Sequence, residues 1–258
     1  SFDTETTSLN YIDARVVGVS MSVAAGSAAY IPFAHHYEGA PEQLTEDEVL
    51  GALKPLLENP AVKKVGQNLK YDRHVLINHG INLQGIADDT MLMSYVLNST
   101  SSRHDMDTLA SNYLDESTTK YEEVAGKGAK QITFDQVDLE IAGPYAAEDA
   151  DITLRLHEVL TKELAAVPSL EKLYREIELP LLNTICDIEQ TGALIDGEIL
   201  LKQSAEIGIR LETLAQEAYT LAEEEFNLGS PKQLQTILFE KLKLPVIKKT
   251  PKGQPSTA

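Results

Sequence analysis

Strand-like and helix-like patterns alternate through the first 165 residues, and this alternation restricts the fold more than any other feature. Residues 16–23 and 27–33 alternate apolar with small or polar side chains on either side of an Ala25-Gly26 turn, as in two antiparallel strands. Shorter strands are expected at residues 64–66 and 85–88. Strands interspersed with helices indicate an α/β fold, in which helices flank a mixed sheet.

The predicted helices carry apolar residues at helical spacing. The clearest begins at Thr45 with an acidic first turn and continues to Leu57. Asp89 directly precedes another, so we interpret it as an N-cap rather than as half of an Asp88-Asp89 metal pair. The remaining helices are expected at residues 68–80, 90–97, 107–113, 134–139 and 144–164.

The pattern changes near residue 167. Residues 170–226 have heptad-like apolar spacing, interrupted only at 192–197, which predicts two long antiparallel helices. We therefore expect one domain at residues 1–167 and a helical segment at 168–258. Both ends interrupt a pattern, because the chain opens on the second half of a strand and closes on a turn that enters a helix. We expect a fragment truncated at both ends.

The net charge of −18 argues against a broad basic surface that grips nucleic acid. The charge is uneven, since residues 230–258 hold six lysines and one acid, Glu240, for a net charge of +5, which leaves −23 for the rest. The single cysteine, Cys186, excludes an internal disulfide and fits a buried, inert thiol. No apolar run reaches the roughly 20 residues of a membrane span, and the first residues lack a secretion signal. We expect a cytoplasmic monomer without membrane contact.

The first acidic pair is Asp3 and Glu5. Side chains two residues apart on a strand share a face, so both carboxylates point to one side, while Phe2 and Thr4 point to the other. Two carboxylates this close repel each other unless a cation lies between them or one takes a proton. An Asp-x-Glu pair alone fits a solvated strand end equally well.

A second motif follows the strand at residues 64–66. Asn68 and Asp72 are four residues apart and stack on one face of the predicted helix. Gly66, at the junction of strand and helix, allows the backbone to approach a ligand closely. An amide–carboxylate pair on an exposed helix explains the same pattern.

A third motif lies in the helix at residues 144–164. Tyr145 and Asp149 share a face at a spacing of four residues. Glu148 and Asp151 are close by, so spacing alone does not decide which acid is a ligand. An acidic helix surface is the alternative interpretation.

The three motifs together indicate more than each does alone. Four carboxylates gathered at one sheet edge need cations, and hard oxygen donors favour Mg²⁺ or Mn²⁺. Two such ions about 4 Å apart suit hydrolysis of a phosphodiester. The pairs His35-His36 and Arg103-His104 lack the spacing of metal ligands, so we place these histidines at the surface or beside a substrate.

The motifs Asp3-x-Glu5, Asn68-x3-Asp72 and Tyr145-x3-Asp149 resemble those of the DEDD exonuclease superfamily, in its tyrosine-bearing branch. The similarity covers essentially the whole chain. The proofreading domain of bacterial family A DNA polymerases resembles residues 2–9, 65–73, 103–107, 122–128 and 145–151, and the start of the polymerase thumb resembles residues 226–257.

The resemblance implies a ribonuclease H-like mixed sheet flanked by helices, followed by an α-helical thumb segment. It also implies a 3′-5′ exonuclease that hydrolyses phosphodiester bonds at DNA 3′ ends with two divalent cations. The expected cation is Mg²⁺, and Mn²⁺ and Zn²⁺ are the alternatives. Asp3, Glu5 and Asp149 would hold one cation, and Asp3 and Asp72 the other. Tyr145 would orient the attacking water.

The resemblance implies substrate contacts as well. Leu9 and Tyr121 would pack against the terminal bases. A member of the family carries phenylalanine at the position of Tyr121, and this ring also offers a face for stacking. Arg103 would contact a terminal phosphate, and Gln67 and Asn68 would lie beside the substrate. The partners would be a single-stranded DNA 3′ end and the remainder of a polymerase chain.

Two other functions fit the same fold. One is an RNA-trimming exonuclease of the superfamily, which the thumb-like segment disfavours. The other is a catalytically silent exonuclease fold that serves as a scaffold in a polymerase. Loss of motif carboxylates would mark that state, and all four are present in this sequence.

Overall fold

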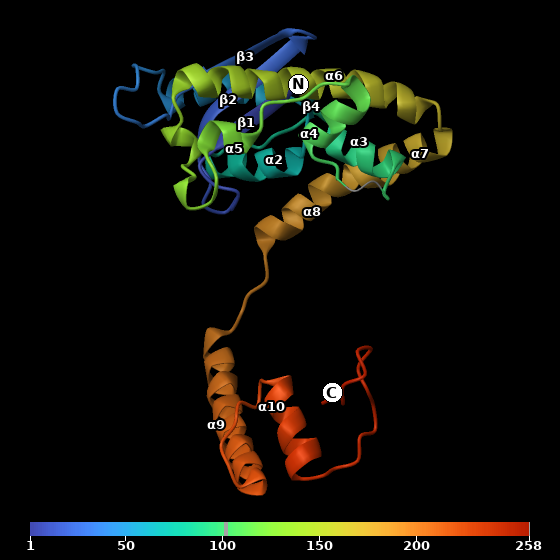
Figure 1. The fold of residues 1–258 in the computed structure, drawn as a ribbon. Coiled ribbons are helices and arrows are strands. Elements are labelled where there is room, and N and C mark those ends of the chain that lie inside the picture. The colour runs from blue at the N-terminus through green and yellow to red at the C-terminus, as the bar shows by residue number, and fades with distance from the viewer. Residues whose placement is uncertain (101–102, 258) are drawn as a thin grey trace. The chain divides into compact units, whose positions relative to one another are not determined.

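The computed structural model describes residues 1–100 and 103–257. The chain forms two compact units, unit 1 at Ser1–Gly192 and unit 2 at Ala193–Ala258. Unit 1 holds a sheet with helices on both sides (Figure 1). The predicted α/β, ribonuclease H-like class is therefore confirmed.

The strands of unit 1 form two hydrogen-bonded sheets, one antiparallel and one parallel. Three antiparallel strands lie in the order β1-β2-β3, and β4 pairs with β5 in parallel. β1 also lies against β4, so the two sheets are neighbours. The predicted strands are all present, with the bounds β1 Phe2–Thr6, β2 Val16–Ala24, β3 Ser27–Pro32, β4 Lys64–Gly66 and β5 Ile86–Asp89.

Capping side chains stabilise the first turns of several helices. Thr45 accepts from the backbone N–H of Glu48, whose side chain accepts from the N–H of Thr45 in turn. Asp89 and Asp138 accept from the first turns of α3 and α6. The helices of unit 1 are α1 Glu46–Leu57, α2 Leu69–Asn78, α3 Thr90–Leu97, α4 Met106–Leu109 with the π-helix Ala110–Leu114, α5 Tyr121–Ala125, α6 Leu139–Ala165, α7 Pro168–Leu173 with the π-helix Tyr174–Glu178, and α8 Leu179–Thr191, with single 3₁₀ turns at Gly128–Lys130 and Phe134–Gln136.

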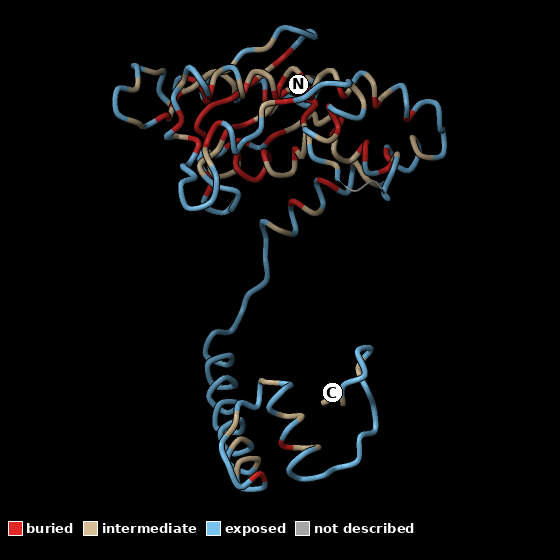
Figure 2. The backbone as a smooth tube through the Cα atoms, viewed as in Figure 1, coloured by how far each residue is buried: buried red, intermediate tan, exposed pale blue. Residues whose placement is uncertain are grey.

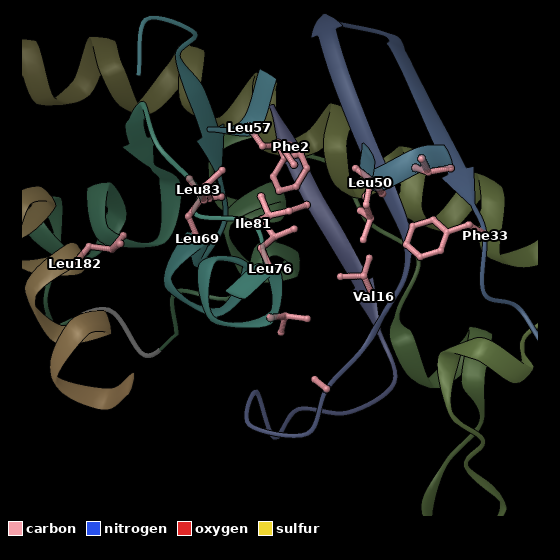
Figure 3. Packing of buried hydrophobic residues seen from close by; sticks show 14 residues of the cluster. Phe2, Val16, Phe33, Leu50, Leu57, Leu69, Leu76, Ile81, Leu83 and Leu182 are labelled. Atoms are coloured by element: carbon pink, nitrogen blue, oxygen red, sulfur yellow. The ribbon is translucent and has the colours of Figure 1, made fainter. Parts of the chain in front are cut away.

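The two faces of the sheet are covered by different helices. α6 runs along one face and contacts strands β1 to β4 (Figure 1). On the other face, Phe2 of β1 packs with Leu69 and Leu76 of α2 in the largest apolar cluster (Figure 3). Figure 2 shows the buried backbone concentrated between these layers in unit 1. A residue of β1 therefore faces either α6 or α2, depending on its parity.

Gly66 has a structural use. A Cβ at this position would lie 2.4 Å from Leu69 Cδ2 and 3.0 Å from the carbonyl oxygen of Phe2. We predicted that a ligand approaches the backbone at Gly66. In the structure, β1 and the first turn of α2 approach it instead.

The helix predicted at residues 134–139 is wrong. Phe134 begins a single 3₁₀ turn and is buried in an apolar cluster, and a new helix begins at Leu139. Asp138 ends the earlier pattern because its side chain caps α6. α6 then continues through Pro144, which we had predicted to be its start, because Ala142 and Ala146 are both buried against the sheet.

The helical region after residue 167 is divided between the units. α7 and α8 belong to unit 1, where Tyr174 and Leu182 are buried. Unit 2 contains α9 Gly197–Ala222, α10 Pro231–Gln235 and the π-helix Thr236–Lys241. The antiparallel pairing of the long helices and the functional division at residue 167 stay predictions. Among the described residues, no helix combines the length and the apolar character that a membrane crossing requires.

Candidate metal centre

Three carboxylates meet between β1 and α6. Asp3 and Glu5 project from the face of β1 that α6 covers, as the spacing predicted, and Asp149 faces them from the middle of α6. One carboxylate oxygen of each lies within 4.8 Å of the others. Glu5 and Asp149 are buried, and Asp3 is half-buried. These oxygens are close enough to bind one cation together.

The state of Glu5 tests whether a cation fits. Its Oε1 is buried and has no hydrogen-bond partner among the described residues. Burial raises the pKa of Glu5, and the charges of Asp3, Asp149 and Asp72 raise it further. A buried oxygen without a partner is costly, and a divalent cation would satisfy it. The donor set consists of carboxylate oxygens, which suits a hard cation.

The fourth predicted carboxylate, Asp72, is held separately. Its Oδ1 accepts from the backbone N–H of Thr4 at 3.0 Å and from the Thr4 hydroxyl at 2.6 Å. Burial and the nearby charge of Asp3 raise the pKa of Asp72. Asp72 therefore interacts with Asp3 from the α2 side of β1, while Glu5 and Asp149 lie on the α6 side.

The two acids closest to Asp149 on α6 have partners of their own. Glu148 accepts from the backbone N–H of Thr119 at 2.8 Å, and Asp151 accepts from the N–H of Gly26. Asp149 remains to face the centre. Its pKa is raised by burial and by Asp3.

Tyr145 lies beside Asp149, as their spacing predicted. Burial raises the pKa of the Tyr145 phenol, and the charges of Asp149, Glu5 and Asp3 raise it further. The hydroxyl interacts with the Asp149 carboxylate and lowers the pKa of that group. The phenol therefore stays protonated at the edge of the acidic cluster, where it can orient a water molecule.

Tyr121 extends an aromatic surface from the centre. Its ring stacks on Phe134, with centroids 6.3 Å apart, and meets Tyr145 edge-on at 6.4 Å. Tyr121 and Arg103 also line a groove of about 820 Å³. The Arg103 side chain is exposed, with Nε 3.3 Å from Asp105.

Leu9 and the two amides were the other predicted substrate residues. Leu9 is 93% exposed on the loop after β1. Gln67 is engaged by the protein, since its Nε2 donates to the carbonyl oxygen of His104 at 2.8 Å and its Oε1 accepts from Thr90. Asn68 begins α2 in a left-handed conformation, with φ of 65°. Whether Leu9, Gln67 and Asn68 touch a substrate stays a prediction.

Residue pattern alone missed the polar groups that surround the acids. Thr4 was expected only to pack on the other face, yet it bonds Asp72; a threonine at a buried strand position was the available signal. Tyr30 was missed as well, and its hydroxyl fills the space above Gly18, the cross-strand partner of Glu5. His35, which we placed at the surface or near a substrate, is buried and lies 2.8 Å from the Tyr30 hydroxyl.

Asp88 and Asp89 stay outside the metal centre. The Asp89 carboxylate accepts from Leu92 N at 3.1 Å, which confirms its N-cap role, and from Leu69 N at 2.7 Å. Asp88 forms an ion pair with Arg175, and its Oδ2 lies 2.9 Å from His157 Nε2.

Comparison with known proteins assigns the chain to a family. A family model described as 3′-5′ exonuclease matches residues 1–165, and one described as DNA polymerase family A matches residues 197–258. The chain belongs to the 3′-5′ exonuclease family of DNA polymerase I. The exonuclease domain of this family is a divalent-metal enzyme, in agreement with the acidic centre.

Two polymerases illustrate the similarity. DNA polymerase I of Pseudomonas aeruginosa is 58% identical, and that of Rhizobium leguminosarum is 42% identical; both alignments cover the whole of this chain. The chain spans 28% and 27% of these two proteins, so it corresponds to about a quarter of a polymerase of this family.

Two solved structures have the same fold. The POL domain of Pol1 from M. smegmatis, in complex with DNA primer-template and dNTP, is 27% identical with a TM-score of 0.78, over the whole of this chain and 39% of that one. Brucella melitensis NrnC is 22% identical with a TM-score of 0.52, over 74% of this chain and 84% of that one. The second likeness concerns the fold alone.

Proposed function

We propose that unit 1 removes nucleotides from the 3′ end of single-stranded DNA by hydrolysis, and that it does so as the proofreading part of a DNA polymerase. The observation that carries the proposal is the group formed by Asp3, Glu5 and Asp149, whose oxygens lie within 4.8 Å of one another. The orphaned Oε1 of Glu5 adds a chemical reason for a cation there.

The chain offers ligands for two divalent cations. Asp3, Glu5 and Asp149 would hold one, and Asp3 with Asp72 would hold the second; Asp72 would bind directly or through water. We propose Mg²⁺, with Mn²⁺ or Zn²⁺ as alternatives, because the donors are carboxylate oxygens. When bound, the cations would activate a water molecule and offset the charge of the phosphate and of the leaving oxygen.

In the proposed reaction, a water oxygen forms a bond to the terminal phosphorus and the bond from phosphorus to the 3′ oxygen breaks. A 5′-mononucleotide leaves, and the shortened strand keeps a 3′ hydroxyl, which takes up a proton. Tyr145 would orient the water through its hydroxyl beside Asp149. Tyr121 offers a ring face on which a frayed base can stack, and Leu9 would pack against the terminal bases.

Arg103, Gln67 and Asn68 complete the proposed substrate contacts. The exposed guanidinium of Arg103 suits a single phosphate. Gln67 would contribute by holding the backbone at His104, next to Arg103. The same site could trim RNA, and the 2′ hydroxyl is the group that would separate the two substrates. We also propose that the protein is a monomer in the cytoplasm and that its partners are DNA and the rest of the polymerase chain.

The test is digestion of single-stranded DNA labelled at its 5′ end, with an RNA of the same sequence in parallel. We expect stepwise shortening of the DNA with Mg²⁺ and none with EDTA. Asp149→Asn and Asp72→Ala should lower the rate at least 100-fold. Asp151→Asn is the matched control, because Asp151 lies two residues away and is bonded to Gly26. Activity that survives both EDTA and Asp149→Asn would exclude the metal mechanism.

A further inference from the structure

The loop between β1 and β2, residues 7–15, begins two residues after Glu5 and carries Leu9. A hydrogen bond of 3.0 Å from Thr7 N to Arg15 O closes the loop at its base. Leu9 projects into solvent from the closed loop. Its position relative to the carboxylates therefore depends on what holds the loop.

α2 holds the loop through backbone and ring contacts. The side-chain amide of Asn78 donates to the carbonyl oxygens of Tyr11 at 2.7 Å and of Ala14 at 3.1 Å. The Tyr11 ring stacks on the imidazole of His74, with centroids 4.1 Å apart and planes inclined by 19°. Tyr11 thus joins the loop to α2 through its side chain as well as its backbone.

Both ring nitrogens of His74 are bonded to α8. Nε2 lies 2.7 Å from Glu189 Oε2, and the amide nitrogen of Gln190 lies 2.7 Å from Nδ1. Because an amide NH₂ only donates, Nδ1 is the acceptor and Nε2 carries the proton that is donated to Glu189. Bonds at both nitrogens fix the plane of this buried ring, and Tyr11 stacks on that plane.

We propose that His74 is a positioning residue for Leu9. α8 fixes the imidazole through Glu189 and Gln190, and the imidazole fixes the loop through Tyr11. The inference rests on the proposed exonuclease function, because that function gives Leu9 a substrate. It assigns α8, the last helix of unit 1, a part in holding the DNA end.

α8 supplies a matched control for this route. Asp187, two residues before Glu189, pairs with Arg73 of α2 at 2.8 Å. Asp187→Ala and Glu189→Ala each remove an acid of α8 that is paired with α2, but only Glu189 is bonded to His74. Lys70→Met separates the second role of Glu189, since Lys70 Nζ lies 2.6 Å from Glu189 Oε1.

The loop side has a matched pair of its own. Tyr11→Leu removes the ring that stacks on His74, whereas Tyr11→Phe keeps the ring and removes only the hydroxyl. An effect of Tyr11→Leu that Tyr11→Phe does not share belongs to the stack. If Glu189→Ala fails to fold, the two Tyr11 variants still test whether the stack on His74 positions the loop.

The experiment uses the full 258-residue chain and two readouts. The first is amide hydrogen exchange of peptides over residues 7–15, without substrate. The second is kcat and KM on 5′-labelled single-stranded DNA with Mg²⁺. Glu189→Ala and Tyr11→Leu should speed exchange in the loop and raise KM by about two- to tenfold, the range that such a stack is worth, with kcat within about twofold of the unchanged chain.

Asp187→Ala, Lys70→Met and Tyr11→Phe should leave both readouts unchanged. The inference is overturned if Glu189→Ala and Tyr11→Leu behave like their controls in loop exchange, or if they lower kcat and leave KM unchanged. Failure of the proposed function is a different result, because the unchanged chain would then not degrade DNA. Loop exchange would still show whether His74 holds the loop.

Discussion

The hydroxyl of Thr4 donates to the buried Oδ1 of Asp72 at 2.6 Å, and the Thr4 backbone N–H donates to the same oxygen at 3.0 Å. This pair joins β1, the strand of Asp3 and Glu5, to α2, the helix that carries the fourth carboxylate. Asp72 therefore acts in the fold as well as in the proposed chemistry.

Thr4→Val keeps the shape of the side chain and removes the hydroxyl. Because removing one partner of a buried hydrogen bond costs about 1–3 kcal/mol, we expect the free energy of unfolding in urea to fall by that amount. The exonuclease rate should fall as well, since Asp72 loses one of its two anchors. Thr4→Ser keeps the hydroxyl and should retain most of the rate. Equal losses in the two variants would show that the hydroxyl is unimportant.

The stability of the metal-free protein should fall as pH rises through the interval from about 4 to 6. Burial raises the pKa of Asp3 from 3.8 to about 6 and raises the pKa values of Glu5, Asp72 and Asp149 as well. An acid with a higher pKa in the folded chain binds protons better when folded, so stability is lost as pH rises through the interval between the unfolded and folded values. Urea unfolding in EDTA at several pH values measures this slope.

Two comparisons check the cause of that slope. Glu5→Gln removes one of the repelling charges and should flatten it. Mg²⁺ at pH 8 should restore stability, because a ligand that binds only the folded state stabilises it by about 2.7 kcal/mol at 100 times its Kd. A slope that is flat in the unchanged chain would contradict the crowding of the four acids.

Tyr145→Phe should slow the chemical step and spare binding. The phenol stays protonated beside Asp149, and in the proposed reaction loss of its hydroxyl would leave the attacking water less well oriented. We expect kcat to fall by about 100-fold, the loss that misplacement of a reacting group can cause, with KM changed less than twofold. Single-turnover digestion measures the step. Tyr95→Phe, on the exposed side of α3, is the control, and an equal loss there would point to a general defect.

Asp89→Ala should cost about 2–4 kcal/mol of stability, roughly twice the cost of one N-cap. The carboxylate caps both α2 and α3, through Leu69 N and Leu92 N. Asp105→Ala is a suitable comparison because Asp105 caps α4 alone, through Thr108 N at 3.0 Å. Unfolding curves of the two variants should therefore differ, and equal costs would contradict the double cap.

Local patterns predicted most of unit 1. Strand periodicity located β2 and β3, and the Thr45 cap located α1, because these features depend on neighbours within a few residues. The helix predicted at residues 134–139 was wrong because the structure there depends on contacts with residues distant in the sequence. Phe134 belongs by packing to the aromatic cluster of Tyr121 and Tyr145, and Asp138 begins the next helix.

The sequence by itself determined which side chains of the candidate site share a face of one strand or helix. Asp3 and Glu5 are paired by the strand repeat, and Tyr145 and Asp149 by the helix repeat. Only the tertiary structure decided which of these faces meet, because that depends on packing between elements far apart in the chain. Packing directs Asp149, rather than Glu148 or Asp151, toward Asp3 and Glu5. It also brings Thr4 within hydrogen-bond distance of Asp72, and α8 within hydrogen-bond distance of His74. No repeat within one element encodes contacts of this kind.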